Sequence, residues 1–307
     1  MKQFRRLLPL FLIASSLSAQ FPMFKAPTEE IKRKWLDLPY ASLSEAQKLD
    51  IYLPDEGDGP FPVILAIHGG AFLGGDKADG QLTPMLEGLR RGYAVVSINH
   101  RLSSEATFPA AVHDVKAAVR WLRAHAEEYK LDGTRIVAWG PSAGGYLAAM
   151  AGVTCGVAEL EDLSLGNADY SSCVQAVVDW FGPINFLTMD EQFRKSGKGR
   201  PNHGEADSPA SLFMGRRITE IPEKVAASNP ESYLSVDDPP ILIMHGTDDP
   251  VVPVEQSIEF AEKLGRIIGS EKCRLILLSG AGHGGPQFSS PETLNQVFEF
   301  IDRVLKD

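Results

Sequence analysis

Residues 135–150, RIVAWGPSAGGYLAAM, contain the turn that decides the fold. The segment before the turn, RIVAW, is short and apolar after its arginine, which is typical of a buried strand, and the segment after it, YLAAM, is typical of a buried helix. Between them lies Gly140-Pro141-Ser142-Ala143-Gly144. A strand-to-helix turn this tight requires glycine on both sides of Ser142, because a Cβ there would collide with nearby backbone. The turn therefore lifts the Ser142 hydroxyl clear of the main chain.

The same turn suits a reaction that creates negative charge. A helix that begins at Ala143 presents unpaired N–H groups and the positive end of its dipole. An ordinary glycine-rich turn has a similar composition, but a strand before it and a helix after it favour the G-x-S-x-G turn of a nucleophile. We therefore expect Ser142 to be a nucleophile and the Ala143 N–H to be one donor to the developing charge.

Short apolar runs bounded by Gly and Pro alternate with helical patterns along the chain. Their apolarity is continuous rather than alternating, which favours strands covered on both faces of a parallel sheet. The predicted strands are Val63–Ile67, Tyr93–Ile98, Arg135–Trp139, Val174–Trp180, Ile241–Met244 and Arg274–Leu278. Apolar residues at helical spacing predict helices over 109–128, 255–268 and 291–305. This order predicts a doubly wound α/β fold with a mostly parallel sheet and helices on both faces.

Two segments depart from this alternation. Residues 41–53, which contain LDIYLP, predict an additional antiparallel strand at the edge of the sheet. Residues 186–232 are polar and interrupted by Gly and Pro, which predicts a long irregular insertion that serves as a lid or binding loop. No repeat or linker divides the chain, so residues 20–307 are expected to form a single domain.

A glycine-rich loop, His68-Gly69-Gly70-Ala71-Phe72, follows the predicted strand 63–67. The backbone N–H groups of Gly70 and Ala71 are expected to form an oxyanion hole together with that of Ala143. A phosphate-binding loop is the alternative for such a segment, but Asp76-Lys77 stands where that motif needs Lys followed by Ser or Thr. His68 is expected to brace the loop rather than to act as a base.

An acid and a base follow two late strands. Asp248 and Asp249 come after ILIM, and His283 comes after RLILL, within Gly280-Ala281-Gly282-His283-Gly284-Gly285. Both positions fall at the carboxyl ends of strands, where open α/β sheets bind their ligands. His283 is expected to take the proton of Ser142, and one of the two aspartates to orient the imidazole. A lone late histidine is more often structural, but three strand-end motifs in the order serine, acid, histidine favour catalysis.

The charge balance excludes other classes of protein. The 307 residues include 40 acidic and 30 basic side chains, a formal net charge of −10, so no nucleic-acid partner is expected. The histidines are scattered and no HExxH or paired CxxC is present, so neither a catalytic metal nor a cofactor is expected.

The amino terminus has the layout of a secretory signal peptide. In MKQFRRLLPLFLIASSLSAQ a positive head precedes an apolar run and then small residues, so residues 1–19 are expected to be removed on export. A membrane anchor is the alternative, but the apolar run is shorter than the roughly 20 residues that span a bilayer. The protein is therefore expected to be secreted or periplasmic, without a membrane anchor.

Export changes how the three cysteines are interpreted. Cys155 and Cys173 flank a polar stretch, and in an oxidising compartment a disulfide between them would close that loop. Two buried thiols that never meet are the alternative, which spacing alone does not decide. Cys273 lies in a predicted strand and is expected to be a buried thiol.

The segments HGGAFLGGDK, GPSAGGYLAAMAG, HGTDDPVVPVEQS and GAGHGG resemble those of the α/β-hydrolase superfamily. Within it the chain is similar to secreted bacterial esterases of the hormone-sensitive-lipase-like and acetylxylan/feruloyl esterase group. The resemblance extends from about residue 40 to the carboxyl terminus. It implies that the acid is the aspartate before proline, Asp249, with Asp248 as the alternative. Ala71 replaces the usual third glycine of the loop but keeps its N–H, and His100 stands where a tyrosine is common.

These residues together predict a serine carboxylic-ester hydrolase that acts through an acyl-enzyme. The expected substrates are acetyl or feruloyl esters of plant polysaccharide fragments, small molecules or oligosaccharides. A general short-chain carboxylesterase or lipase-like enzyme is the alternative, and an exopeptidase or a catalytically inactive binding protein is less favoured. Trp180 and Phe181, which end a strand, are candidates for the substrate pocket wall, although core packing explains them equally well. The sequence does not indicate an oligomeric state.

Overall fold

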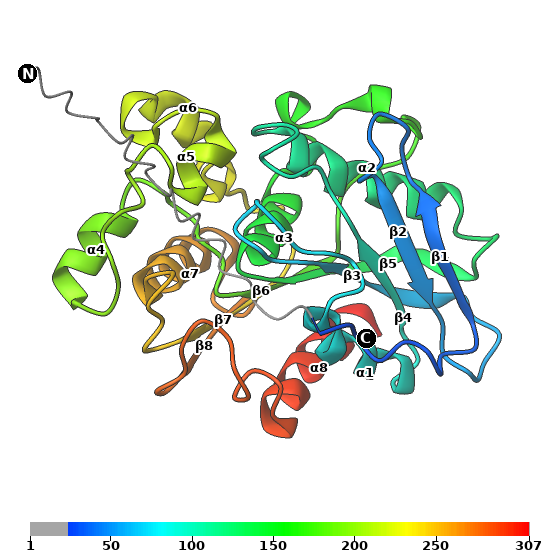
Figure 1. Ribbon diagram of the computed structural model, residues 1–307. Coiled ribbons are helices and arrows are strands. Elements are labelled where there is room, and N and C mark those ends of the chain that lie inside the picture. Colours follow the sequence, from blue (N-terminus) through cyan, green and yellow to red (C-terminus); the bar gives the residue numbers. More distant parts are fainter. Residues whose placement is uncertain (1–23, 307) are drawn as a thin grey trace, which may run out of the picture.

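The computed structural model describes residues 24–306, and the predicted signal segment 1–19 lies outside them. In the described residues one sheet has the strand order β1-β2-β4-β3-β5-β6-β7-β8 (Figure 1). Its strands are β1 (Lys34–Pro39), β2 (Lys48–Tyr52), β3 (Phe61–Ile67), β4 (Ala94–Ile98), β5 (Leu131–Pro141), β6 (Ala176–Trp180), β7 (Ile241–Gly246) and β8 (Cys273–Leu278). Every neighbouring pair from β4 to β8 is parallel, whereas β2 is antiparallel to β1 and to β4. The predicted mostly parallel sheet is confirmed.

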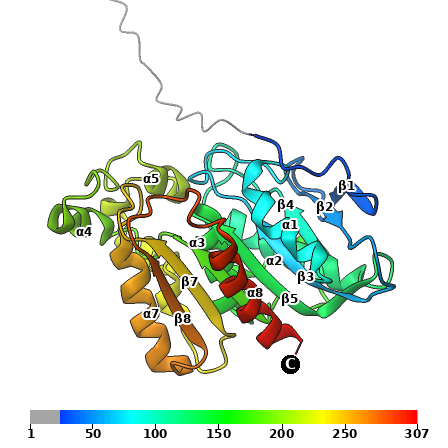
Figure 2. The same cartoon turned by 90° about the horizontal axis from the view of Figure 1, so that it is seen from below.

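Helices cover both faces of this sheet. They are α1 (Thr83–Arg90), α2 (Ala110–Ala124), α3 (Ala143–Val153), α4 (Met189–Ser196), α5 (Pro209–Met214), α6 (Pro222–Ala227), α7 (Val254–Ile268) and α8 (Pro291–Leu305). Figures 1 and 2 show α1 and α8 on one face and α2, α3 and α7 on the other. Along β3, Val63 and Leu65 belong to the core under α2, α3 and α7, while Ile64 and Ala66 belong to the core under α1 and α8. Burial on both faces explains the continuous apolarity of the central strands.

The edge of the sheet differs from the prediction. The antiparallel strand predicted within 41–53 exists as β2, but β1 lies outside it and is the true edge strand. Most of the β1 side chains are exposed, so KWLDLP carries no pattern of buried residues that would have marked it as a strand. A register shift between Trp35 and Leu38 interrupts its pairing with β2, which is a common feature of edge strands.

The insertion at 186–232 is not irregular, as the sequence had suggested, but contains three short helices, α4, α5 and α6. Its glycines and prolines mark the ends of these helices. Gly197 and Gly215 adopt left-handed conformations at the carboxyl ends of α4 and α5, and Pro209 occupies the first turn of α5. Both are the usual places for these residues at helix ends. The insertion lies beside α7 and the carboxyl ends of β6 and β7 (Figure 1).

A disulfide closes the loop that follows α3. Cys155 and Cys173 are bonded to each other, with their Cα atoms 4.9 Å apart. The loop packs over the polar side of α2, where Lys116 and Arg120 are fully buried and contact the Glu161 carboxylate at 2.9 Å and 2.6 Å. The polar stripe of α2 is therefore an internal ion-pair site for this loop. The third cysteine, Cys273, is half-buried on β8 and free.

Candidate active site

Ser142 stands alone between β5, which ends at Pro141, and α3, which begins at Ala143. Its backbone is strained, with φ 54° and ψ −122°, and its N–H donates to the Trp180 carbonyl at 2.8 Å. A Cβ on Gly140 would strike the backbone of Gly144, and a Cβ on Gly144 would strike the carbonyls that end β3. Glycine is therefore required at both positions, as the sequence predicted, and the serine hydroxyl projects from the turn.

The Ser142 hydroxyl contacts a histidine from a distant part of the chain. His283, in the loop after β8, places Nε2 2.9 Å from the Ser142 Oγ. Its other ring nitrogen, Nδ1, lies 2.7 Å from Oδ2 of Asp249, in the loop after β7. The Asp249 side chain is fully buried and that of His283 is 13% exposed. A hydroxyl, an imidazole and a carboxylate in this order form the arrangement of a nucleophile, its base and the group that orients the base.

Asp249 is held as an anion by several donors. Its Oδ1 accepts hydrogen bonds from the N–H groups of Val251 and Val252 at 2.7 Å and 2.9 Å. Burial raises the pKa of Asp249, but hydrogen bonds from His245 and His283 outweigh burial and hold the pKa well below its usual range. The carboxylate therefore stays charged across the pH range in which histidine titrates.

The alternative acid, Asp248, points elsewhere. Its carboxylate pairs with Lys198 of the insertion at 2.9 Å, and its side chain is 59% exposed. The tertiary structure thus brings Asp249, and not Asp248, to His283.

His245 is part of the site, and the sequence analysis did not single it out. It lies on β7, is fully buried, and places Nε2 3.2 Å from Oδ2 of Asp249 and 3.0 Å from the Val252 carbonyl. Its Nδ1 lies 2.6 Å from the Ser257 hydroxyl. Because both neighbours of Nε2 are acceptors, Nε2 carries the hydrogen. In the neutral ring, Nδ1 then accepts a hydrogen bond from the Ser257 hydroxyl. The signal in the sequence that could have identified His245 is its position at the end of the strand that precedes Asp249.

The loop His68–Gly75 runs beside the Ser142 turn. A Cβ on Gly69 would lie 3.3 Å from the Ser142 Cβ. The loop folds back on itself through positive φ angles at Gly70, Ala71 and Phe72, so that the N–H groups of Leu73 and Gly74 donate to the Gly70 carbonyl. Within residues 24–306, the N–H groups of Gly70 and Ala71 donate to no protein acceptor. The Ala143 N–H lies at the start of α3, so the three expected donors come from two segments that meet at Ser142.

Two stacked histidines support this loop. The rings of His68 and His100 lie 4.5 Å apart and nearly parallel, and the His68 Nδ1 contacts the Gly69 carbonyl at 2.7 Å. Burial lowers the pKa of His68 below its usual value and lowers that of His100 to about 3. Both rings are therefore neutral near pH 7. These contacts agree with a bracing role for His68.

The two pocket-wall candidates lie in different surroundings. Phe181 packs edge-on against the His283 ring, with centroids 4.7 Å apart, and also contacts Phe288. Trp180 packs on Trp139 and Phe288 in the core and is 4% exposed. Phe181 thus borders the site and holds the imidazole, whereas the Trp180 side chain is a core residue whose carbonyl supports the Ser142 turn.

Within residues 24–306, no cluster of three or more His, Cys, Asp or Glu side chains has an arrangement suited to a metal ion. No helix in this range is both long and apolar enough to cross a membrane.

Comparison with known proteins places this geometry in a family. The BD-FAE family model matches residues 49–264, about 70% of the chain. Esterase LipC of Mycobacterium tuberculosis is 30% identical over 241 residues, which are 78% of this chain and 57% of that protein. The chain spans about half the length of the curated relatives it matches.

Two solved structures are also similar. A truncated carbohydrate esterase from gut microbiota superposes with a TM-score of 0.80 at 35% identity, covering 92% of this chain and all of that chain. A bifunctional GH43-CE protein of Bacteroides eggerthii superposes with a TM-score of 0.75 at 37% identity, covering 89% of this chain and 35% of that one. Because the family model matches most of this chain, the chain belongs to the BD-FAE family of α/β-hydrolase esterases.

Proposed function

We propose that this protein is a serine esterase that hydrolyses carboxylic esters of carbohydrates, with acetyl or feruloyl groups on plant polysaccharide fragments as its substrates. The observation that carries the proposal is the contact of the Ser142 Oγ with the His283 Nε2 at 2.9 Å, while the His283 Nδ1 lies 2.7 Å from Asp249. The similarity to structures named as carbohydrate esterases supports the carbohydrate part of the proposal.

The proposed reaction begins with attack of the Ser142 Oγ on the ester carbonyl carbon as its proton passes to the His283 Nε2. The carbonyl oxygen becomes an anion, which the N–H groups of Gly70, Ala71 and Ala143 stabilise. Each such donor is worth about 3 kcal/mol of barrier. Collapse of this intermediate expels the alcohol, which takes the proton from His283.

The acyl group then remains on Ser142 until water attacks it. His283 removes a proton from the water, and the second intermediate collapses to release the acid and restore the serine. Through both steps the Asp249 carboxylate keeps the Nδ1 hydrogen of His283 in place and stabilises the imidazolium.

The test compares the wild type with Ser142→Ala on p-nitrophenyl acetate and butyrate. Removal of a serine nucleophile lowers kcat by at least about 10,000-fold, with circular dichroism unchanged. Equal rates for the two proteins would overturn the assignment of the nucleophile. A panel of acetylated xylan, methyl ferulate and tributyrin then tests the substrate class. Hydrolysis of tributyrin alone would favour the alternative, a general short-chain esterase.

Export of the protein is part of the proposal. It is supported by the signal-peptide layout of residues 1–19 and by the Cys155–Cys173 disulfide, since such bonds persist in oxidising compartments. Mass spectrometry of the protein produced in a bacterial host with its native leader should find a mature amino terminus near residue 19 or 20 outside the cytoplasm. An intact leader on protein retained in the cytoplasm would overturn this part.

A further inference from the structure

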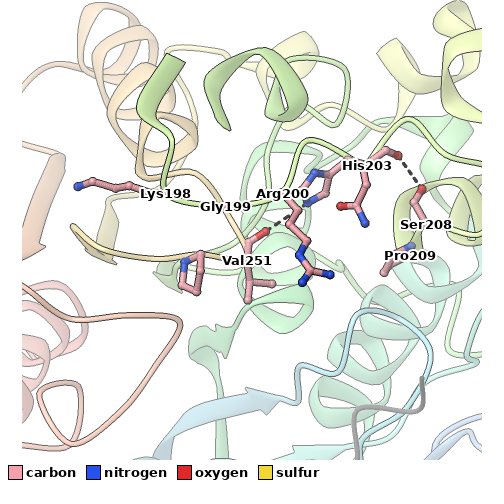
Figure 3. A pocket seen from close by; sticks show the side chains of 9 residues that line it. Lys198, Gly199, Arg200, His203, Ser208, Pro209 and Val251 are labelled. Carbon is pink, nitrogen blue, oxygen red and sulfur yellow. Dashed lines mark hydrogen bonds between the residues drawn. The ribbon is translucent and has the colours of Figure 1, made fainter. Parts of the chain in front are cut away.

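A cavity of about 540 Å³ lies beside the loop that carries the candidate acid. One wall is the 198–209 segment of the insertion, and the other is Pro250 and Val251, which directly follow Asp249 (Figure 3). This volume lies within the range of small-molecule binding sites. The lining contains no residue of the Ser142 turn or of the His68–Gly75 loop. The cavity therefore lies on the side of the acid loop, outside the residues expected to act on the ester.

The insertion wall of the cavity is fixed to the acid loop. His203 places Nε2 3.2 Å from the Val251 carbonyl and Nδ1 3.1 Å from Asp190 on α4. Lys198 donates to the Thr247 carbonyl at 2.6 Å and pairs with Asp248 at 2.9 Å. The segment between Lys198 and His203 is thus anchored at both ends, so its backbone does not need to be ordered when a ligand binds.

Arg200 lies in the middle of this anchored segment, and its exposed side chain has no partner within residues 24–306. Figure 3 shows its side chain extending into the cavity. The Asp190 and Asp248 carboxylates pair with His203 and Lys198 rather than with Arg200. Among the described residues, no ion pair or side-chain hydrogen bond uses the Arg200 guanidinium, and none uses the Asn202 amide beside it. The cavity lining therefore includes an exposed guanidinium and an exposed amide that no described protein group engages, in a protein whose net charge is −10.

These groups select a particular chemistry. A guanidinium offers parallel N–H donors in a planar fork that matches a carboxylate in a bidentate contact. A primary amide offers both a donor and an acceptor, which suits hydroxyl groups. A ligand that carries a carboxylate and several hydroxyls satisfies both, and a uronic acid residue is such a ligand.

We propose that this cavity is a subsite for a uronic acid residue in the carbohydrate part of the substrate, with Arg200 pairing with its carboxylate. The inference rests on the proposed function in that it takes the substrate to be a carbohydrate ester. Binding at the subsite supplies energy remote from the ester bond, which favours acidic over neutral oligosaccharides.

The first experiment measures binding without chemistry. Calorimetry compares xylotetraose with an aldotetraouronic acid, a xylotriose that bears one 4-O-methylglucuronic acid, on the wild type, Arg200→Gln and Arg200→Lys. The wild type should bind the acidic ligand at least about 5-fold more tightly than the neutral one. Arg200→Gln should abolish this preference, and Arg200→Lys should keep part of it, because lysine retains the charge but not the fork.

Arg194→Gln is the matched control. Arg194 is an exposed arginine of the same insertion, on α4, and does not line the cavity. Arg194→Gln removes the same charge from the protein as Arg200→Gln. An equal loss of the preference for the acidic ligand in both variants would show a general charge effect and overturn the subsite. The subsite would also be overturned if Arg200→Gln weakened the binding of both ligands equally, or if the wild type showed no preference for the acidic ligand.

A second experiment uses acetylated acidic and neutral xylo-oligosaccharides as substrates. The ratio of their kcat/KM values should fall at least about 5-fold in Arg200→Gln and stay unchanged in Arg194→Gln. The two experiments separate the two proposals. If the wild type hydrolyses no ester but binds the acidic ligand through Arg200, the proposed function fails and the subsite stands. If the wild type hydrolyses esters but shows no preference for acidic substrates, the proposed function stands and the subsite fails.

Discussion

The Nε2 atom of His245 lies 3.2 Å from Oδ2 of Asp249, the same carboxylate oxygen that contacts His283. The Asp249 carboxylate therefore stands between two imidazoles, one fully buried on β7 and one that faces Ser142. Ser257 extends the chain of contacts behind His245. Such a buried chain of donors and acceptors fixes the position of every member. A member that moved away would lose its hydrogen bond, and no water would be present to replace that bond.

His245 is therefore expected to be a positioning residue. A hydrogen bond to a charged group is worth about 1.5–3 kcal/mol, so His245→Leu, which removes the donor, should lower kcat about 10- to 100-fold with little change in KM. Loss of this donor leaves more negative charge on Asp249 to stabilise the imidazolium of His283, so the acidic limb of the kcat/KM profile should move to higher pH. Ser257→Ala should shift both readouts in the same direction but less. A variant that loses only stability, with kcat and pH profile unchanged, would refute the positioning role.

The two adjacent aspartates should respond very differently to loss of charge. Asp249→Asn removes the acceptor that fixes the His283 tautomer, and kcat should fall by about 10,000-fold. Asp248→Asn breaks an ion pair whose members are both about half exposed, and such pairs are worth about 0–1 kcal/mol. Activity on p-nitrophenyl acetate should then stay within about 3-fold of wild type. A larger loss in Asp248→Asn than in Asp249→Asn would reverse the assignment of the acid.

Asp179 should make the folded protein less stable as pH rises. It is fully buried on β6, its Oδ1 accepts the Gly182 N–H at 2.9 Å, and within the described residues its Oδ2 has no partner. Burial raises its pKa to about 6. A raised carboxyl pKa means that stability is greatest below the unfolded pKa near 4, falls as pH rises to about 6, and then levels off.

Asp179→Asn removes this titration and keeps an acceptor for Gly182. At pH 8 it should raise the free energy of unfolding by up to about 3 kcal/mol, and at pH 4 it should have little effect. Urea unfolding at the two pH values measures the difference. The same change in unfolding free energy at both values would show that the carboxyl group does not titrate in this range.

The disulfide should contribute to stability and not to catalysis. Cys155 and Cys173 are 18 positions apart, and closing a loop of that length stabilises by about 3 kcal/mol through the unfolded chain. Replacing both cysteines by serine should lower the unfolding free energy by this order and leave kcat unchanged at 25 °C. Alkylation of the denatured, unreduced wild type should find one thiol per chain, that of Cys273. Three thiols would contradict the bond.

The central fold followed from local patterns. Continuous apolar runs predicted β3 to β8, and helical spacing predicted α2, α7 and α8 within a few residues of their observed bounds. These elements are buried on defined faces, so their residue types carry the signal. β1 was missed because its exposed side chains carry no such signal. The helices of the insertion were missed because Gly and Pro, which end helices, also occur in irregular loops.

The candidate site was predictable in its members but not in their contacts. Ser142, Asp249 and His283 follow strands, and parallel strands bring such positions to one edge of the sheet. His245 was noted only as one scattered histidine, because neither its burial nor its contact with Asp249 is written in residues 245–249. The side-chain directions of Trp180 and Phe181 were likewise open, and only packing placed Phe181 on His283 and Trp180 in the core.

The sequence by itself determined the turn at Ser142, because a strand-to-helix turn with a projecting side chain needs glycine on both sides within five residues, and that constraint is local. The tertiary structure alone decided which aspartate meets His283 and that Arg200 lies beside the acid loop. Those relations join segments that are 34 or more residues apart, as between Asp249 and His283. Sheet pairing and the packing of the insertion on the acid loop set such distances, and no short stretch of residues encodes them.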